Sequence, residues 1–397
     1  MDDMTIVDPT SVRQPVLTEV GGAHIRRRRR PGLSRDTIFD LFGAAAAGAS
    51  ASFLLFGRLA AFSGSIGFFL VAYFVFLIVY ALLVSLRDDA VAIWDAVMSV
   101  VLTSAAVVAF GALAMVVSFT LWRGRTALLH KNFFTQDMSR AGPLAPLSVG
   151  GVAHALVGTL WTIGIAVVLT VPLGIVCAIY LDQTRGRPAR FVRTIVLAMT
   201  ALPSILAGLF IYASWILTFG FQQSGFAAAL ALSIMMLPYI IRTSDLVLRL
   251  VPGGLREASA ALGAPRWRTV CHVVVPTARS GLATGVILGV ARGIGEASPV
   301  LLTAGFTTYV NADPFHGPMV SLPLEALKLV QSGVPAYVAR GFAAATFLLL
   351  VIMGLFILAR VIGGWGPGNL NRRQRRRAER ASARDVARFS RMSGGMG

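Results

Sequence analysis

Between Leu255 and Pro299 the chain first reads Leu255-Arg-Glu-Ala-Ser-Ala-Ala-Leu-Gly-Ala-Pro-Arg-Trp-Arg268 and ends with Arg292-Gly-Ile-Gly-Glu-Ala-Ser-Pro299. Helix formers fill the start of this stretch, and Gly263 can adopt the left-handed conformation that ends a helix. Pro265 suits the first turn of a second short helix, and Pro276 suits the start of another. We therefore expect an exposed elbow of two short helices within residues 253–278, followed by an apolar segment that contains two opposite charges.

The composition indicates a membrane protein. Of the 397 residues, 56% are hydrophobic and 14% are charged, and the mean hydropathy is +0.72. Such values are typical of chains that cross a bilayer several times. The net charge of +18 could indicate a nucleic-acid partner, but the basic residues gather at segment ends and in both tails, which favours anchoring to a membrane face. Cys177 and Cys271 have no metal-binding or redox spacing, so no metal site is predicted.

Eight apolar segments are predicted to cross the bilayer. They are Leu41–Leu55, Gly67–Leu86, Val91–Leu121, His154–Leu181, Ile195–Phe219, Ser224–Ile241, Gly281–Phe306 and Gly341–Val361. An even number of spans puts both tails on one side, and their arginines assign that side to the cytoplasm. The elbow is then cytoplasmic as well, and residues 307–339 lie outside.

Arg292 and Glu296 are four residues apart and would share one face of a helix. A charge inside a membrane span costs about 3 kcal/mol on insertion scales, so such residues usually face a cavity or each other. The planar guanidinium of an arginine suits an oxyanion such as phosphate. Ser298 and Pro299 continue the same segment and complete the predicted substrate pathway. The alternative is a structural ion pair that fixes helix packing.

Prolines recur within the apolar segments, at Pro172, Pro203, Pro238 and Pro299. Each one removes a backbone donor and can kink its helix. Kinked helices suit spans that reorient around a pathway, although packing irregularity in a rigid bundle would leave the same pattern.

The elbow resembles the EAA loop of bacterial ABC importer permeases. The resemblance rests on Glu257-Ala-Ser259, on Gly263 six residues after the glutamate, and on Val273-Val-Val-Pro276. Ser259, Val273 and Val275 depart from the family pattern by small or apolar exchanges. The resemblance implies that Glu257, Ala258, Gly263 and Pro276 belong to a coupling helix that docks into an ATPase. Without it, the elbow could be a plain interfacial loop held on lipid headgroups by Arg256, Arg266, Trp267 and Arg268.

Other stretches resemble the PstA-type permeases of bacterial phosphate importers. These are Arg292-x-x-Gly295-Glu296-x-x-Pro299, with Ala297 where that family usually has Thr, and Leu202-Pro-Ser-Ile-Leu-Ala-Gly-Leu209. Asp313-Pro-Phe-His-Gly317 resembles the external segment of the actinobacterial members. The resemblance covers about Val91 to Ile362.

The implied fold is an all-α polytopic membrane protein with about eight transmembrane helices. A six-span type I ABC importer permease core would follow an N-terminal two-span hairpin. The expected parts are a basic cytoplasmic tail (1–39), the hairpin (40–90), the permease domain with its coupling loop (91–363) and an Arg-rich cytoplasmic tail (364–397).

The resemblance also implies a set of partners in the bacterial plasma membrane. They are a PstC-like second permease, a PstB-like ATPase dimer that binds ATP and Mg²⁺, and a PstS-like extracytoplasmic phosphate-binding protein. The binding protein would dock near Asp313, Phe315, His316 and Gly317. The chain itself contains no Gly-Lys pair and hence no P-loop, so we expect a non-catalytic subunit without a bound cofactor.

Three other functions remain open from sequence. The chain could carry another oxyanion such as sulfate, molybdate or phosphonate, and the Arg292–Pro299 segment favours phosphate over these. It could be a secondary carrier driven by an ion gradient, which the elbow disfavours. It could also be a phosphate sensor that signals through its tails.

Overall fold

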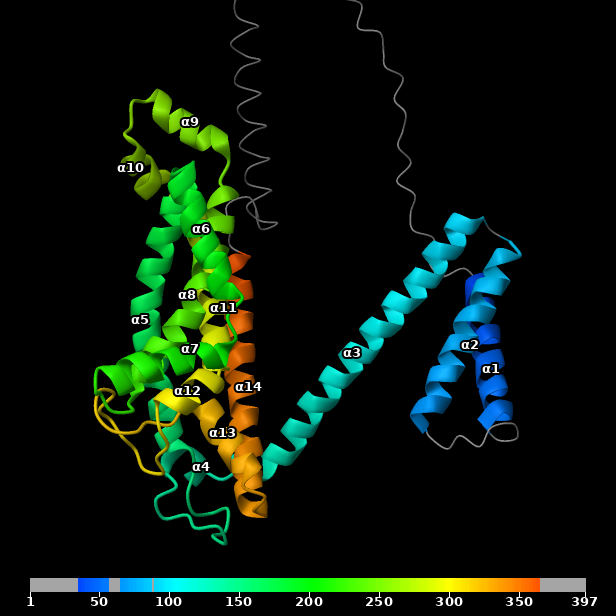
Figure 1. The fold of residues 1–397 in the computed structure, drawn as a ribbon, viewed down its shortest axis with the longest axis horizontal. Coiled ribbons are helices and arrows are strands. Elements are labelled where there is room, and N and C mark those ends of the chain that lie inside the picture. Colours follow the sequence, from blue (N-terminus) through cyan, green and yellow to red (C-terminus); the bar gives the residue numbers. More distant parts are fainter. Residues whose placement is uncertain (1–34, 57–64, 88, 365–397) are drawn as a thin grey trace, which may run out of the picture. The chain divides into compact units, whose positions relative to one another are not determined.

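The computed structural model describes residues 35–56, 65–87 and 89–364, and these described residues form helices and connecting loops without a strand (Figure 1). Contacts along the backbone divide the chain into two compact units, one up to Leu113 and one from Ala114 onward. The boundary lies inside the long helix α3 (Ala90–Leu128).

The first unit contains α1 (Arg35–Leu54), α2 (Ser65–Ser85) and the first part of α3. α1 and α2 approach closely at Gly48, where an added Cβ would lie 2.6 Å from the Ala72 carbonyl oxygen. The Tyr73 hydroxyl and Ser104 Oγ, 2.6 Å apart, hydrogen-bond α2 to α3. With 39 residues, α3 is about 58 Å long at 1.5 Å per residue, nearly twice the thickness of a bilayer's hydrocarbon core.

The second unit is a helical bundle with short helices at both ends (Figure 1). Its elements after α3 are α4 (Asn132–Thr135), α5 (Ala153–Gln183), α6 (Arg187–Thr200), α7 (Ser204–Ile211), a π-helical turn (Tyr212–Thr218), α8 (Gly225–Arg249), α9 (Gly253–Ala261), α10 (Arg266–Thr269), a second π-helical turn (Val270–Val274), α11 (Val275–Ile294), α12 (Ser298–Thr303), α13 (Leu322–Gln331) and α14 (Pro335–Gly363).

Helix α8 lies at the centre of this bundle. Within its most apolar window 61% of the residues are buried, against 28% or less in the other candidate spans. Leu232, Met236 and Ile240 recur every four residues along its buried face, the spacing that aligns side chains on one side of a helix. α5 and α11 pack against α8, and α14 packs against α11, and together these helices bury the core.

Two of the four prolines expected to kink spans lie at helix breaks. Pro203 ends a sharp bend of 101° between α6 and α7, so the apolar segment Ile195–Phe219, expected as one span, is divided there. Pro299 begins α12 after the gap that follows α11. Pro172 and Pro238 lie inside the continuous helices α5 and α8.

Seven helices among the described residues are long and apolar enough to cross a membrane, or eight if the bent pair counts as one span. This agrees with the predicted all-α multi-pass architecture. The seventh predicted span, Gly281–Phe306, differs from expectation at both ends. It starts at Arg266, because the π-helical turn joins α10 to α11 without a gap, and it ends at Ile294, before α12 begins.

Candidate functional site

The charged segment lies at a break between two helices. α11 ends at Ile294, Gly295 closes it, and α12 begins at Ser298 with Pro299 in its first turn. The Glu296 amide donates to the Gly293 carbonyl, 3.2 Å away, and this turn carries the chain across the gap. Gly295 and Pro299 account for the interruption because glycine disfavours the helix interior and proline starts a new one.

The structure brings Arg292 and Glu296 together, with Arg292 Nη2 2.9 Å from Glu296 Oε1. The Arg292 side chain is 50% exposed and the Glu296 side chain 14%. The Arg292 guanidinium also lies over the Tyr239 ring of α8, 5.5 Å from its centroid. Among the described residues this is Arg292's one ion pair, and it engages a single nitrogen. The remaining N–H donors of the guanidinium are therefore available to an anion.

Pro299 connects this break to the bend of the α6–α7 pair. A Cβ added at Gly208 of α7 would lie 2.7 Å from Pro299 Cα, which no side chain could tolerate. Gly208 is therefore the residue that lets α7 pack directly on α12. Ser298, the fourth member of the predicted pathway, is half-buried beside Pro299. The four predicted residues Arg292, Glu296, Ser298 and Pro299 thus surround one helix break.

The elbow, residues 253–278, has the two-helix form that the sequence predicts. Gly263 has φ +74°, the left-handed conformation, and directly follows the last residue of α9 and its cap. Pro265 precedes α10. The Ser259 and Thr269 hydroxyls lie 2.8 Å apart and hydrogen-bond α9 to α10.

An ion pair fastens the elbow to the bundle. Arg256 of α9 donates from Nη1 to Asp182 Oδ2 at 2.9 Å and from Nη2 to Asp182 Oδ1 at 3.2 Å. Nη2 also donates to the Leu248 carbonyl at 2.9 Å. Asp182 is 6% exposed and lies at the end of α5. Arg256 therefore anchors α9 to the bundle. These contacts explain the presence of Arg256 without the alternative role of binding lipid headgroups.

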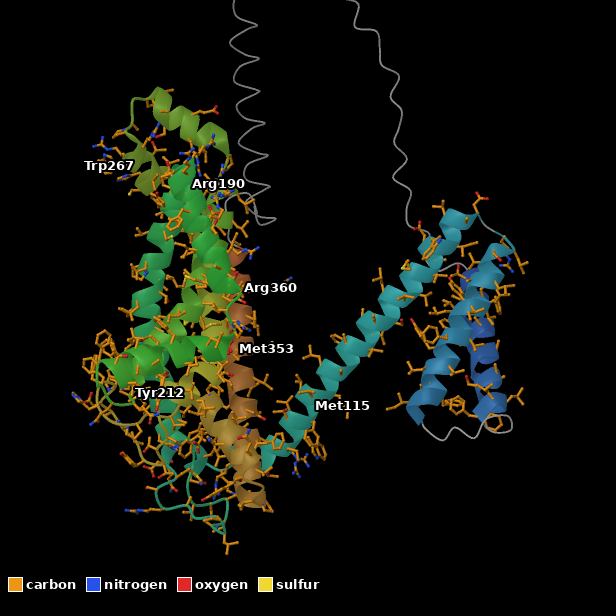
Figure 2. The ribbon with its side chains drawn as sticks, viewed as in Figure 1. Met115, Arg190, Tyr212, Trp267, Met353 and Arg360 are labelled. Atoms are coloured by element: carbon orange, nitrogen blue, oxygen red, sulfur yellow. The ribbon has the colours of Figure 1, made fainter. Side chains whose placement is uncertain are left out.

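Among the described residues, none covers the outer surface of the elbow. α9 has no buried residue, and Leu255, Leu262 and Trp267 are 43%, 89% and 61% exposed. Trp267 lies at the tip of the unit, on α10 (Figure 2). Glu257, Ala258 and Pro276 are also exposed. Small residues and a few large apolar ones on a short helix form the kind of surface that fits a groove.

The segment around Asp313 is a tightly hydrogen-bonded loop. Asn311 donates from Nδ2 to the carbonyls of His316 and Pro318, and Asp313 accepts from the Phe315 amide and from His316 Nδ1 at 2.8 Å. Gly317 has φ +76° and allows the final turn. The predicted docking residues Asp313, Phe315, His316 and Gly317 therefore form one compact turn.

Two features of this loop bear on recognition. The Phe315 amide, and then His316, hold the pKa of the Asp313 carboxyl below its usual range. The Phe315 ring is 58% exposed and packs 5.2 Å from the Phe226 ring, beside a cavity that Trp215 and Phe221 also line. The loop thus offers a charged edge next to an aromatic hollow.

The second unit also contains a buried polar pair and a buried arginine that the sequence analysis did not single out. His154 Nε2 of α5 and Glu325 Oε1 of α13 lie 3.4 Å apart, and both side chains are at most 1% exposed. Arg340 of α14 is 1% exposed and donates from Nη2 to the carbonyls of Ala145, Pro146 and Val149. In the sequence, Arg340 directly precedes an apolar run, and a charge at that position was the signal that could have indicated a buried arginine.

The part of the chain that the structure describes has no group of three or more His, Cys, Asp or Glu side chains placed to hold a metal ion.

Residues 170–364 match the family model described as the binding-protein-dependent transport system inner membrane component. The match defines the class of protein, the helical membrane permeases of ABC importers with the type I fold. An inward-facing structure of the MetNI methionine ABC transporter aligns with 54% of this chain and 91% of its own, at 22% identity and a TM-score of 0.40.

Curated relatives narrow the class. The phosphate transport system permease protein PstA 1 of Mycobacterium tuberculosis is 42% identical over 241 residues, which cover 60% of this chain and 79% of that protein. PstA of Mycobacterium leprae is 40% identical over 244 residues, 61% of this chain and 80% of that protein. PstA of Pasteurella multocida is 35% identical over 221 residues, which cover 54% of this chain and 77% of that protein. The chain belongs to the PstA family of phosphate transport system permease proteins.

Proposed function

We propose that this chain is the membrane subunit of an ATP-driven importer of inorganic phosphate. It would move the anion by alternating access and receive energy through the elbow from a separate ATPase. The observation that carries the proposal is the Arg292–Glu296 pair at a helix break in a chain of the PstA family.

The chemistry of Arg292 supports an anion as the substrate. Its guanidinium is half-exposed, engages Glu296 through a single nitrogen, and lies at a point where the backbone changes direction. An arginine stays charged at any physiological pH and can donate paired hydrogen bonds to a tetrahedral oxyanion. Glu296 competes for the same donors, so it would limit the affinity for phosphate and allow the anion to leave.

The elbow supports coupling to a partner. Its outer face is exposed and partly apolar, whereas its inner face is held to α5 by the Arg256–Asp182 pair. A push on the outer face would therefore pass to α5 directly and to α11 through the continuous helix that starts at Arg266. Glu257, Ala258, Gly263 and Pro276 would form the contact with the ATPase.

The remaining partners follow from the family. The chain would pair with a PstC-like permease and rest on a PstB-like ATPase dimer, which would hydrolyse ATP with Mg²⁺. It would receive phosphate from a PstS-like binding protein near Asp313, Phe315, His316 and Gly317. Both termini and the elbow would lie in the cytoplasm of the bacterial cell. No cofactor and no nucleic acid would bind this chain.

The test is uptake of radiolabelled phosphate into vesicles that contain this chain, its permease mate, the ATPase and the binding protein. We expect ATP-dependent uptake that excess sulfate or molybdate does not suppress. Uptake of a different anion would contradict the phosphate assignment, and uptake that persists without the ATPase would contradict ATP coupling.

The role of Arg292 needs its own variant. Arg292→Ala should lower uptake and phosphate-stimulated ATP hydrolysis at least tenfold. Arg279→Ala is the matched control, because Arg279 lies on the same helix and is exposed. Equal activity of the two variants would remove Arg292 from the pathway.

A further inference from the structure

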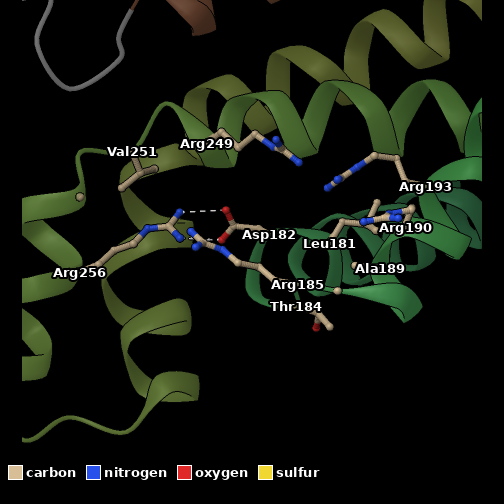
Figure 3. Close-up of a pocket in the computed structure, with 12 residues that line it drawn as sticks. Leu181, Asp182, Thr184, Arg185, Ala189, Arg190, Arg193, Arg249, Val251 and Arg256 are labelled. Carbon is tan, nitrogen blue, oxygen red and sulfur yellow. Dashed lines mark hydrogen bonds and ion pairs between the residues drawn. The ribbon is translucent and has the colours of Figure 1, made fainter.

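A cavity rich in arginine lies between the elbow and the ends of two long helices. It has a volume of about 580 Å³ and is lined by the turn from α5 to α6, the end of α8 and the start of α9 (Figure 3). Five arginines line it: Arg185, Arg190, Arg193, Arg249 and Arg256. The cavity is separate from the Arg292 break. It lies beside the elbow, which leads into the start of α11, whereas Arg292 is in the last turn of that helix.

The positive charges of this cavity exceed the negative charges beside it. Asp182 is engaged by Arg256, and Asp245 by Arg249 at 3.0 Å and by Arg193 at 4.0 Å. Five guanidinium groups therefore meet two carboxylates. Like charges at this spacing repel one another, so the arrangement is stable only when water, salt or a bound anion offsets the excess.

Arg185 and Arg190 supply the unmatched charge. Within the described residues neither guanidinium has an ion pair or a hydrogen bond. In Figure 3 Arg185 extends toward the Arg256–Asp182 pair, and the ends of Arg193 and Arg249 approach each other across the cavity. Arg185 and Arg190 are both exposed, so their guanidinium groups are accessible to an anion in the cavity.

Arg193 also lines the cavity, and its side chain is 42% exposed. Its Nη2 lies 4.0 Å from Asp245 Oδ2, which is a long contact for an ion pair. Guanidinium N–H donors of Arg193 therefore remain for an anion in the cavity.

Helix α6 contributes its positive end to the same place. It begins at Arg187 after Gly186, which has φ +99°, and no side chain caps its first turn. Gly186 and Ala189 line the cavity. The free amides of a helix N-terminus and its dipole favour a phosphate group.

We infer that this cavity binds a phosphoryl anion, and that Arg185, Arg190 and Arg193 are its principal ligands. Two sources offer this chemistry, free orthophosphate and the headgroup of an anionic phospholipid. Binding next to Arg256, the anchor of the elbow, would bias the position of α9. The site is separate from the proposed pathway at Arg292, and only its cytoplasmic location rests on the proposed function.

The test compares two variants of the full chain. Arg185→Gln combined with Arg190→Gln removes both unmatched charges without breaking a described contact. Arg279→Gln removes one exposed arginine of α11 that does not line the cavity. Arg190→Gln alone serves as a milder second variant. Each protein is placed in phosphatidylcholine nanodiscs.

Two probes separate the sources of the anion. Equilibrium binding of radiolabelled orthophosphate tests the free ion, and native mass spectrometry with added phosphatidylglycerol tests the lipid. We expect the double variant to bind at least one probe at least tenfold more weakly than the Arg279→Gln control, with Arg190→Gln intermediate. Loss with orthophosphate identifies the free ion, and loss with phosphatidylglycerol alone identifies the headgroup.

Arg292→Ala distinguishes this site from the transport pathway. It should lower phosphate uptake at least tenfold but leave binding of the probes in the cavity unchanged. The inference is overturned if the double variant binds both probes as tightly as the control. It is also overturned if the double variant binds both probes normally and instead loses the ATPase, since the arginines would then be an ATPase contact.

Discussion

Arg256 and Asp182, 74 residues apart in sequence, form a two-point ion pair that joins the elbow to the end of α5. A carboxylate as buried as Asp182 is costly to leave unpaired, because its hydrogen bonds to a charged partner offset its loss of water. The pair therefore fixes the angle at which α9 leaves the bundle.

Arg256→Gln should loosen α9 without unfolding the bundle. We expect the amides of residues 253–261 to exchange with deuterium about tenfold faster, because one charge-assisted anchor is worth about 1.5–3 kcal/mol. Hydrogen exchange with mass spectrometry measures this. Asp182→Asn should have a similar effect, and adding it to Arg256→Gln should change little more. Additive effects of the two substitutions would contradict a direct pair.

Gly263→Ala should weaken the attachment of the ATPase. A side chain in the left-handed conformation costs about 1–2 kcal/mol, so the α9–α10 turn would open. Gly333→Ala is a matched control, because Gly333 has φ +71° against +74° at Gly263, and an added Cβ at either glycine meets no atom within 4 Å. Gly333 lies between α13 and α14, away from the elbow. Co-purification should separate the two variants, and equal retention of the ATPase would argue against coupling through the elbow.

Glu296→Gln should tighten phosphate binding and slow transport. The substitution removes the carboxylate that competes with phosphate for the N–H donors of Arg292. Because the Arg292 side chain is 50% exposed, its ion pair with Glu296 is weak. We expect a lower KM for phosphate together with a lower maximal uptake rate. Initial-rate uptake measurements over a range of phosphate concentrations decide this. A higher KM with an unchanged maximal rate would show that Glu296 assists phosphate binding.

Arg340→Leu should lower the thermal stability of the second unit. The substitution leaves three carbonyls, of Ala145, Pro146 and Val149, without their charged donor. The expected loss is about 2 kcal/mol, or several degrees in Tm. Arg360→Leu on the same helix is the control, because Arg360 is exposed. Differential scanning fluorimetry in detergent should show a larger drop for Arg340→Leu, and equal shifts would mean that the buried contacts contribute nothing.

The Asp313 carboxyl should titrate at a lower pH than a free aspartate. The Phe315 amide and His316 stabilise its charged form, so the pKa of Asp313 falls below its usual range. A lowered folded-state pKa means that Asp313 stabilises the loop above the unfolded-state pKa. This contribution is lost as the pH falls through the lower, folded-state pKa. The carbon-13 shift of the carboxyl follows the titration. His316→Ala should raise the midpoint only in part, because the Phe315 amide is the larger cause.

The sequence predicted local features well. The Gly263–Pro265 break and the approach of Arg292 to Glu296 depend on residues within one or two turns, so spacing alone indicates them. A kink was expected at Pro203, but its size, a 101° bend that divides the predicted span Ile195–Phe219, was not, because an apolar run has the same pattern whether the helix through it is straight or broken. The Arg256–Asp182 anchor depends on tertiary packing that no local pattern contains. The same is true of the meeting of five arginines from three helices and the α5–α6 turn.

The contact between Gly208 and Pro299 has a mechanical consequence. Pro299, in the first turn of α12, packs on Gly208 in the middle of α7 with no side chain between the two backbones. A displacement of α12 at the charged break would therefore press directly on the backbone of α7. Even one methyl group added at position 208 would force the two helices apart, so it would change their spacing as well as the stability of the contact.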